Sequence, residues 1–387
     1  MPRSAIREVM ELAAGRPEVI HLEVGEPDQN VDPQIIARAC DALHEGWTKY
    51  SPISGQPGLR EKVAARYTSR WGKTVDIGRV VITTGAIGGL FSSLMAILDQ
   101  GDEVLVPDPG WPNYESICHL AGARAVRYRL DPATGYLPSI EEIRRLTGSR
   151  TKAILINTPG NPTGAVFPEP IMRALAEHVA EQGLYLISDE IYEDMVFEGS
   201  HVSAASFDIE DRLFVISGVS KSYAMTGFRL GFLICPPSLA PVAAMLQEPI
   251  TSGAASPSQK AAEAALAGDQ SGVQVLCDKF RRRSEVFVDA LDPGIVPVRP
   301  KGAFYVLLDI SRTGMRSLDF CKLLLKEDAV ATVPGITFGP ASDTTIRVAF
   351  TADDSALVEA ARRISGRISS LAAKDDASPS RQAEAAK

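Results

Sequence analysis

The sequence predicts an α/β fold with a large domain, built on a mostly parallel sheet flanked by helices, and a smaller α+β domain. Short runs of β-branched and other apolar residues alternate with helical patterns through the first two-thirds of the chain. These runs are apolar almost throughout, as expected of strands that helices cover on both faces. Strands that alternate with helices of this length indicate βαβ units. The length of 387 residues favours a second domain.

The strands expected in the large domain are short and follow one another along the chain. In order, they cover Val80–Thr84, Glu103–Val106, Ala153–Ile156, Tyr185–Ile187, Leu213–Ile216 and Leu230–Ile234. A helical pattern from Gly88 to Leu98 follows the first strand. Pro107 and Pro109 end the second, because proline has no N–H group to donate to a sheet. This alternation supports a mostly parallel sheet and leaves the strand order open.

The pattern changes beyond about Gln259, where long helical stretches lead into a second set of strands. The helical stretches run to Gly268 and then from Val273 to Leu291. The strands are expected at Ala303–Leu308, Ala329–Val333 and Thr345–Ala349. We assign these three strands to the smaller α+β domain.

These changes divide the chain into two predicted domains and a tail. The large domain covers residues 30–275, and the small domain combines residues 1–29 with residues 276–372. Residues 373–387 are mostly small and charged and have no apolar face. We therefore expect this tail to be disordered.

The charge balance argues against a nucleic-acid partner. Lys and Arg number 40 against 48 Asp and Glu, which gives a formal net charge of −8. Binding to phosphate backbones needs a basic surface, and this composition does not supply one. No stretch of about 18 apolar residues is present, so we expect no membrane partner either.

The cysteines favour a reducing compartment. They are odd in number and widely spaced, and no two form a Cys-x-x-Cys pair. The N-terminal stretch carries charges and lacks the apolar core of a secretory signal. We therefore predict a cytoplasmic protein with reduced thiols at Cys40, Cys118, Cys235, Cys277 and Cys321.

Polar segments follow three of the predicted strands directly. They are Asn157–Gly164, Ser188–Tyr192 and Ser217–Lys221. In open parallel sheets, ligands bind at the edge where the strands end. Each segment alone is unremarkable, because Asn-Pro-Thr-Gly is commonly a turn and Asp-Glu or Ser-Lys pairs are commonly solvated.

Taken together and in this order, the segments resemble those of the fold-type-I pyridoxal phosphate enzymes, specifically the class I/II aminotransferases related to aspartate and aromatic aminotransferases. The resemblance extends from Gly25 to Arg347. It implies a homodimeric enzyme that binds pyridoxal 5'-phosphate and moves an amino group from an amino acid to a 2-oxo acid. The cofactor-attachment pattern of the family is matched at Gly218, Ser220, Lys221, Ala224, Met225, Gly227, Arg229 and Gly231.

The resemblance assigns the catalytic roles. Lys221 is implied to form the Schiff base with the cofactor and to move the substrate proton. Asp189 is implied to pair with the pyridine nitrogen, so that the ring acts as an electron sink. Asn161 and Tyr192 are implied to hydrogen-bond the phenolic oxygen of the ring. A tyrosine such as Tyr192 could instead be a core residue with a satisfied hydroxyl.

The resemblance also assigns a phosphate site. The amides of Ala86 and Ile87 open a helix after a strand, where an anion is favoured. Arg229 is implied to supply a guanidinium fork. Ser220 is the expected hydroxyl donor, with Ser217 as the alternative.

Four further residues complete the expected site. Trp111 is implied to stack on the cofactor ring, although a core tryptophan is the alternative. Tyr50 is implied to reach the phosphate of the neighbouring subunit. Arg347 is implied to grip the substrate α-carboxylate with a planar fork, assisted by Asn161 and by a backbone contact from Gly25.

Two other functions stay open on the same scaffold. One is a different pyridoxal phosphate reaction, such as carbon–sulfur elimination or a cyclising or oxidising variant. The other is a non-catalytic cofactor-binding regulator. The five histidines are too scattered to form a metal site by local spacing, so no metal is expected. The run Arg281–Arg283 is expected on a solvated or interface face of a helix.

Overall fold

The computed structural model, described here for residues 5–376, is built around one seven-stranded sheet. The strand order is β2-β8-β7-β6-β5-β3-β4. All neighbours are parallel except β8, which runs antiparallel to β2 and β7. The α/β class with a mostly parallel sheet is therefore confirmed. The strands are β2 (Val80–Thr83), β3 (Glu103–Asp108), β4 (Arg124–Arg129), β5 (Thr151–Asn157), β6 (Tyr185–Asp189), β7 (Leu213–Gly218) and β8 (Gly231–Ile234).

The two faces of this sheet carry separate apolar cores, which explains the continuous apolar runs. Successive side chains point to opposite faces, so Leu213 and Val215 join one core while Phe214 and Ile216 join the other. The first core includes residues of α3 (Pro57–Trp71), α6 (Ile140–Leu146), α7 (Glu169–Gln182) and α10 (Ser256–Ala267). The second includes residues of α4 (Gly85–Met95), α5 (Asn113–Leu120) and α8 (Ala240–Met245).

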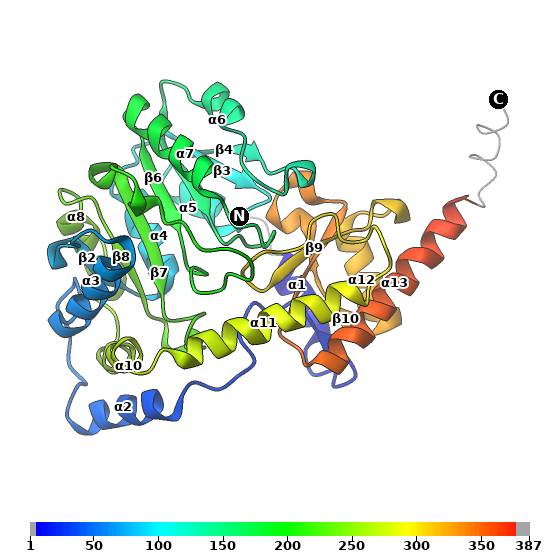
Figure 1. Ribbon diagram of the computed structural model, residues 1–387, viewed down its shortest axis with the longest axis horizontal. Helices are drawn as coiled ribbons and strands as arrows, with labels where there is room; N and C mark the ends of the chain where they lie inside the picture. Colours follow the sequence, from blue (N-terminus) through cyan, green and yellow to red (C-terminus); the bar gives the residue numbers. More distant parts are fainter. Residues whose placement is uncertain (1–4, 377–387) are drawn as a thin grey trace.

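A second, smaller α+β part lies beside the large sheet (Figure 1). It contains an antiparallel sheet in the order β11-β12-β9 and a two-stranded parallel sheet of β1 and β10. Its strands are β1 (Ile20–His21), β9 (Tyr305–Asp309), β10 (Val330–Ala331), β11 (Val333–Pro334) and β12 (Thr345–Ala349). Its core includes residues of α1 (Ala5–Ala13), α11 (Ser271–Asp289), α12 (Ser317–Asp328) and α13 (Asp354–Asp376).

Helix α11 runs from the large sheet to the small part, as Figure 1 shows. It begins at Ser271 and crosses the domain limit predicted at residues 275 and 276. The ranges 30–275, and 1–29 with 276–372, stay a prediction. The remaining helices, α2 (Pro33–His44) and α9 (Glu248–Thr251), lie with the large part, where α2 packs against α10.

Several sequence-based expectations need correction. Helix α4 covers Gly85–Met95, so it begins before Gly88 and ends before Leu98, the limits of the helical pattern. Gly85 itself has a φ of +70°, a turn conformation that glycine adopts without strain. Strand β4 was not predicted, since its sequence Arg-Ala-Val-Arg-Tyr-Arg has no apolar run. The strand expected at Ala329–Val333 is two short strands in different sheets, β10 and β11.

The C-terminal helix is longer than the sequence suggests. Helix α13 continues to Asp376, so residues 373–376, which we expected in the disordered tail, are helical. The rest of that predicted tail lies outside the described residues. Across residues 5–376, we find no helix with the length and apolar character needed to cross a membrane.

Candidate active site

The strand ends of the large sheet open into a cleft of about 470 Å³. Loops after β5, β6 and β7 reach it from the large part, and β9 and β12 contribute from the small part. Of the residues predicted for the site, all except Tyr50 line this one cleft. They are Gly25, Ala86, Ile87, Trp111, Asn161, Asp189, Tyr192, Ser220, Lys221, Arg229 and Arg347.

Lys221 follows β7 and presents its amine to the cleft. Its Nζ donates a 2.7 Å hydrogen bond to the backbone oxygen of Gly25. Burial lowers the pKa of the amine to about 8; Glu26 acts in the opposite direction, and Arg347 and Arg229 reinforce the effect of burial. This amine therefore loses its proton much more readily than that of an ordinary lysine, which suits a nucleophile or base.

Asp189 ends β6 and is buried beside the hydroxyl of Tyr114. Tyr114 donates to its Oδ2 at 2.7 Å, and the backbone N–H of Ile191 donates to its Oδ1 at 3.3 Å. Burial raises the pKa of Asp189 to about 6, although both hydrogen bonds oppose the change. A buried acid of this kind would gain from a cationic partner at the same place.

Arg347 projects from β12 into the cleft, and not all of its N–H groups have a hydrogen-bond acceptor among the described residues. Its Nη2 donates to the backbone oxygen of Glu23 at 2.6 Å, and its Nη1 donates to Asn161 Oδ1 at 3.3 Å. Its Nε is buried without a hydrogen-bond partner among the residues described. The guanidinium lies over the rings of Tyr305 and Phe338, and burial lowers its pKa. A buried cation with a free donor fits an anionic ligand.

Tyr192 and Tyr305 form one wall of the cleft. Their hydroxyls lie 2.9 Å apart, and burial raises the pKa of both. The hydroxyl of Tyr192 therefore has a side-chain partner in Tyr305. This contact is also what the alternative, a core tyrosine with a satisfied hydroxyl, would show. Tyr305 was not predicted, because its role depends on a partner 113 residues away.

Gly85, Arg229 and Ser220 form the region expected to bind phosphate. Helix α4 begins at Gly85, and a Cβ built there would come 2.8 Å from Arg229 Nη2, so the arginine approaches the helix start closely. Ser220 lines the cleft. The alternative hydroxyl, that of Ser217, donates to Glu193 at 2.9 Å instead.

Trp111 and Tyr50 differ in their placement. Trp111 lines the cleft and packs edge-on against Tyr114, with ring centroids 5.6 Å apart. Tyr50 lies outside the cleft and is 90% exposed, on a separate groove formed with residues 251–257. Because Tyr50 does not line the cleft of its own chain, the contact predicted for it would need a second subunit.

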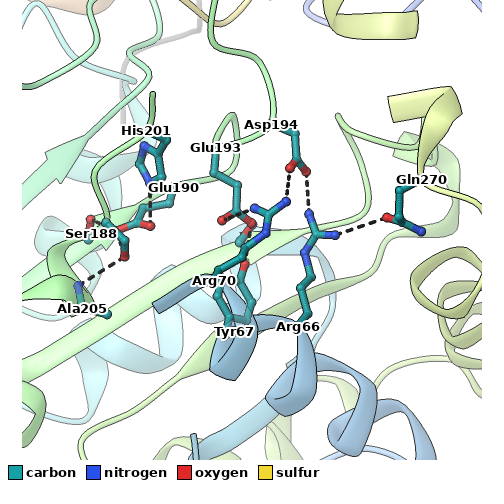
Figure 2. A network of polar contacts seen from close by, with 12 residues as sticks. Arg66, Tyr67, Arg70, Ser188, Glu190, Glu193, Asp194, His201, Ala205 and Gln270 are labelled. Carbon is teal, nitrogen blue, oxygen red and sulfur yellow. Dashed lines mark hydrogen bonds and ion pairs between the residues drawn. The ribbon is translucent and has the colours of Figure 1, made fainter. Parts of the chain in front are cut away.

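A polar network, shown in Figure 2, holds the segment that follows β6. From α3, Arg70 contacts both Glu193, at 2.9 Å, and Asp194. Tyr67 donates a 2.6 Å hydrogen bond to the other oxygen of Glu193. The network fixes the two residues directly after Tyr192 and thereby positions that tyrosine.

The same network reaches the turn that carries the cleft amine. Arg66 Nη2 donates to Asp194 at 2.7 Å, and Arg66 Nη1 donates to the Tyr223 hydroxyl at 3.1 Å. Tyr223 in turn donates to Gln270 Oε1 at 2.5 Å, directly before α11. Figure 2 draws the contact between Arg66 and the same Gln270. Sequence reasoning missed these residues, because no local pattern links α3 to partners more than 100 residues away.

Glu190 and His201 form a buried pair at the other end of Figure 2. Glu190 Oε2 lies 2.8 Å from His201 Nε2, and its Oε1 accepts from the hydroxyls of Ser188 and Ser203. Ligand atoms of Glu190, Glu193 and His201 come within 4.8 Å of one another. Hydrogen-bond donors already engage both carboxylates, so we interpret the group as a structural ion pair.

The basic run on α11 is only partly solvated. Arg283 is 4% exposed and donates two 2.9 Å hydrogen bonds to the carboxylate of Asp28. Asp28 belongs to the Gly25–Asp28 segment, so α11 anchors the loop that contacts Lys221. The expectation of a solvated or interface face is therefore wrong for Arg283.

Comparison with known proteins gives a single family. The profile of the aminotransferase class I and II family matches residues 17–364. The chain belongs to this family. It is a pyridoxal phosphate-dependent aminotransferase by its membership and by the activities of its relatives.

The similar proteins agree on the reaction type and differ in the substrates in their names. An aspartate aminotransferase of Pyrococcus horikoshii is 35% identical over 94% of this chain and 94% of its own length. An arginine–pyruvate transaminase of Pseudomonas aeruginosa is also 35% identical, over 90% of this chain and 89% of its own. The structure of Thermus thermophilus aspartate aminotransferase with maleate matches with a TM-score of 0.89 and 33% identity, covering 95% of this chain and 97% of that one.

The aminotransferase offers groups that fit the cofactor of its family. Three groups in the cleft carry the argument: an amine of lowered pKa on Lys221, a buried acid at Asp189 and an arginine fork at Arg229 beside a helix start. An aldehyde, a protonated pyridine nitrogen and a phosphate are their respective complements. The residues present therefore fit pyridoxal 5'-phosphate.

Proposed function

We propose that the aminotransferase binds pyridoxal 5'-phosphate in the cleft and transfers the amino group of an α-amino acid to a 2-oxo acid. The observation that carries this proposal is that Lys221, Asp189 and Arg347 line a single cleft, each with the charge state or free donor its role needs. When bound, the cofactor supplies an electron sink that stabilises negative charge on the substrate Cα.

Each residue then has a defined task. Lys221 would hold the cofactor covalently through Nζ and, once displaced by the substrate, would move the proton from the substrate Cα to the cofactor carbon that receives the amino group. Asp189 keeps the pyridine nitrogen protonated, while Tyr114 fixes the orientation of the carboxylate. Asn161 and Tyr192 are assigned to the phenolic oxygen, and Trp111 to the face of the ring.

The phosphate is assigned to the helix start and its neighbours. The amides of Ala86 and Ile87 begin α4, where the helix dipole favours an anion. Arg229 and Ser220 add a charged fork and a hydroxyl from the loop after β7.

The overall test is a product analysis of the purified protein with amino donors and either 2-oxoglutarate or pyruvate as acceptor. Transfer should require both substrates and yield a new amino acid. Release of ammonia and pyruvate without any 2-oxo acid would instead indicate elimination, the alternative reaction on this scaffold. A protein that binds the cofactor and turns over no substrate would be the regulator.

Arg347 tests the substrate class. Arg347→Lys keeps the charge and loses the planar fork, so we expect kcat/KM for α-amino acids to fall by about 10- to 100-fold, the range for loss of one charge-assisted hydrogen bond. The fall should be much smaller for simple amines, which have no carboxylate to place. Steady-state rates with matched amines and amino acids measure the difference. An equal loss for both classes in Arg347→Ala would make Arg347 structural.

We also propose a homodimer in which Tyr50 reaches the phosphate of the partner subunit. Its 90% exposure in the single chain supports this, since a large aromatic residue there is available to a second copy. Tyr50→Phe should weaken cofactor affinity about tenfold, the size expected for one hydrogen bond to a charged group. Cofactor titration at dimer-forming and at nanomolar protein concentrations checks it. Full activity as a diluted monomer would contradict the proposal.

We propose a cytoplasmic location, which the five free cysteines support. Four of them are buried, and burial raises the pKa of each of those thiols. Cell fractionation with activity assays checks the location, and recovery outside the cytoplasmic fraction would contradict it.

A further inference from the structure

The cleft contains two acidic residues that the proposed function does not use. Within residues 5–376, the cations lining it are Lys221, Arg229 and Arg347, and the proposed function assigns each a partner: the cofactor aldehyde, the phosphate and the α-carboxylate. One of its acids is assigned to the pyridine nitrogen. Glu23 and Glu26 remain, so the charged residues of the cleft that have no assigned partner are both negative.

Glu23 is the more informative of the two. It follows β1, is 3% exposed, and lies beside the proposed carboxylate site, since its backbone oxygen accepts from Arg347 at 2.6 Å. Its Oε1 lies 2.8 Å from His21 Nδ1, whereas its Oε2 is buried with no hydrogen-bond partner in the part of the chain that the structure describes. A buried carboxylate oxygen without a donor is costly, so this position favours a ligand that brings one.

Glu26 adds a second negative charge on the same side as the amine. Its Oε1 accepts a hydrogen bond from the Thr226 hydroxyl, and its charge favours the protonated form of Lys221. A substrate carboxylate beside Glu23 would therefore meet a like charge and no unassigned cation from the described residues, and Glu26 adds to the negative charge of the cleft. A cationic group would meet an opposite charge at Glu23.

The rest of the lining suits a side chain with an aliphatic stem. Ile6 and Met10 on α1 line the same cleft and have no assigned role. Methylene groups gain by contact with such surfaces while a charged end reaches a polar partner. Apolar walls together with a free carboxylate oxygen match a chain of methylenes that ends in an ammonium or guanidinium group.

We infer that the amino donor of this enzyme has a cationic side chain, which the carboxylate of Glu23 recognises. This inference rests on the proposed function and deepens it by naming the class of donor. It makes Glu23 a specificity-determining residue, with Glu26 supporting the same preference through its charge.

The test compares kcat/KM for five donors at one fixed acceptor: lysine and arginine as cations, norleucine as the uncharged analogue of lysine, and aspartate and glutamate as anions. Lysine or arginine should exceed norleucine by about tenfold, as one charge-assisted hydrogen bond allows. Glu23→Gln should remove about that factor for the cationic donors and leave norleucine nearly unchanged. Glu141→Gln, an exposed acid in the first turn of α6, is the matched control and should change no donor ratio.

The outcomes separate the inference from the function on which it rests. Aspartate or glutamate exceeding norleucine would overturn the inference and leave the aminotransferase standing, because a cation would then have to come from elsewhere. An unchanged lysine-to-norleucine ratio in Glu23→Gln would also overturn it. Absence of transfer with every donor would overturn the function itself. Should Glu23→Gln fail to fold by circular dichroism, the ranking of donors by the unaltered enzyme still decides.

Discussion

Lys221→Ala should lose nearly all turnover while the protein still binds the cofactor. The variant keeps the groups assigned to the phosphate and the pyridine nitrogen but lacks both the covalent attachment and the proton carrier. Because nucleophilic attachment and general acid–base catalysis are lost together, we expect kcat to fall on the order of 10⁴-fold. Stopped assays with the best donor measure the loss, and absorbance after gel filtration measures retained cofactor.

The pKa of Lys221 gives this prediction an independent readout. Borohydride reduction of the unaltered protein should fix the cofactor to the peptide that contains Lys221. If cofactor is added to protein freed of it, the yield of fixed cofactor should rise with pH through about 8, where the buried amine loses its proton. A surface lysine would show the rise only near its ordinary value. Normal turnover in Lys221→Ala, or fixation elsewhere, would rule out the assignment.

Asp189→Asn should be the second most damaging change. It keeps the shape of the side chain and removes the negative charge that a protonated pyridine nitrogen needs. Breaking one side of a buried charge pair costs about 3–5 kcal/mol, which corresponds to about two to four decades in rate if the whole cost appears in the transition state. Asp189→Glu should retain far more activity, and kcat/KM for one donor compares the two variants.

The hydrogen bond from Tyr114 provides the control for Asp189. Tyr114→Phe keeps the ring and removes the 2.7 Å hydrogen bond to Oδ2. Because the charge stays, this variant should lose far less activity than Asp189→Asn. Equal rates for Asp189→Asn and Asp189→Glu would mean that the charge itself is irrelevant.

The parts of the fold that the sequence predicts well are those with a local signal. The buried strands are apolar on both faces, so β5, β6 and β7 were recognisable, and the polar segments that follow them were placed at the cleft edge. Strand β4, with the sequence Arg-Ala-Val-Arg-Tyr-Arg, has no apolar run and therefore no such signal. The separate pairing of β10 and β11 could not be foreseen either, since their partners, β1 and β12, are distant in sequence.

The same distinction holds for the site. Residues within continuous motifs, such as Lys221 and Asp189, were found, whereas their supporting partners were not. Tyr305 touches Tyr192 from another part of the chain, and Arg66 and Arg70 meet Glu193 and Asp194 across more than 100 residues. Such contacts exist only after folding. They follow from the packing of α3 and β9 around the cleft and not from any spacing along the chain.

The division of the cleft between two parts of the molecule has a stereochemical consequence. The amine of Lys221 comes from the large sheet, the guanidinium of Arg347 comes from β12, and the apolar wall at Ile6 and Met10 comes from α1. In the proposed function, these would make three separate contacts around one tetrahedral carbon. With the amino group and carboxylate held in place, the mirror-image substrate would exchange its side chain with the Cα hydrogen. Its side chain would then point away from the apolar wall and its hydrogen away from Lys221, so the proposed function predicts that one enantiomer reacts and the other does not.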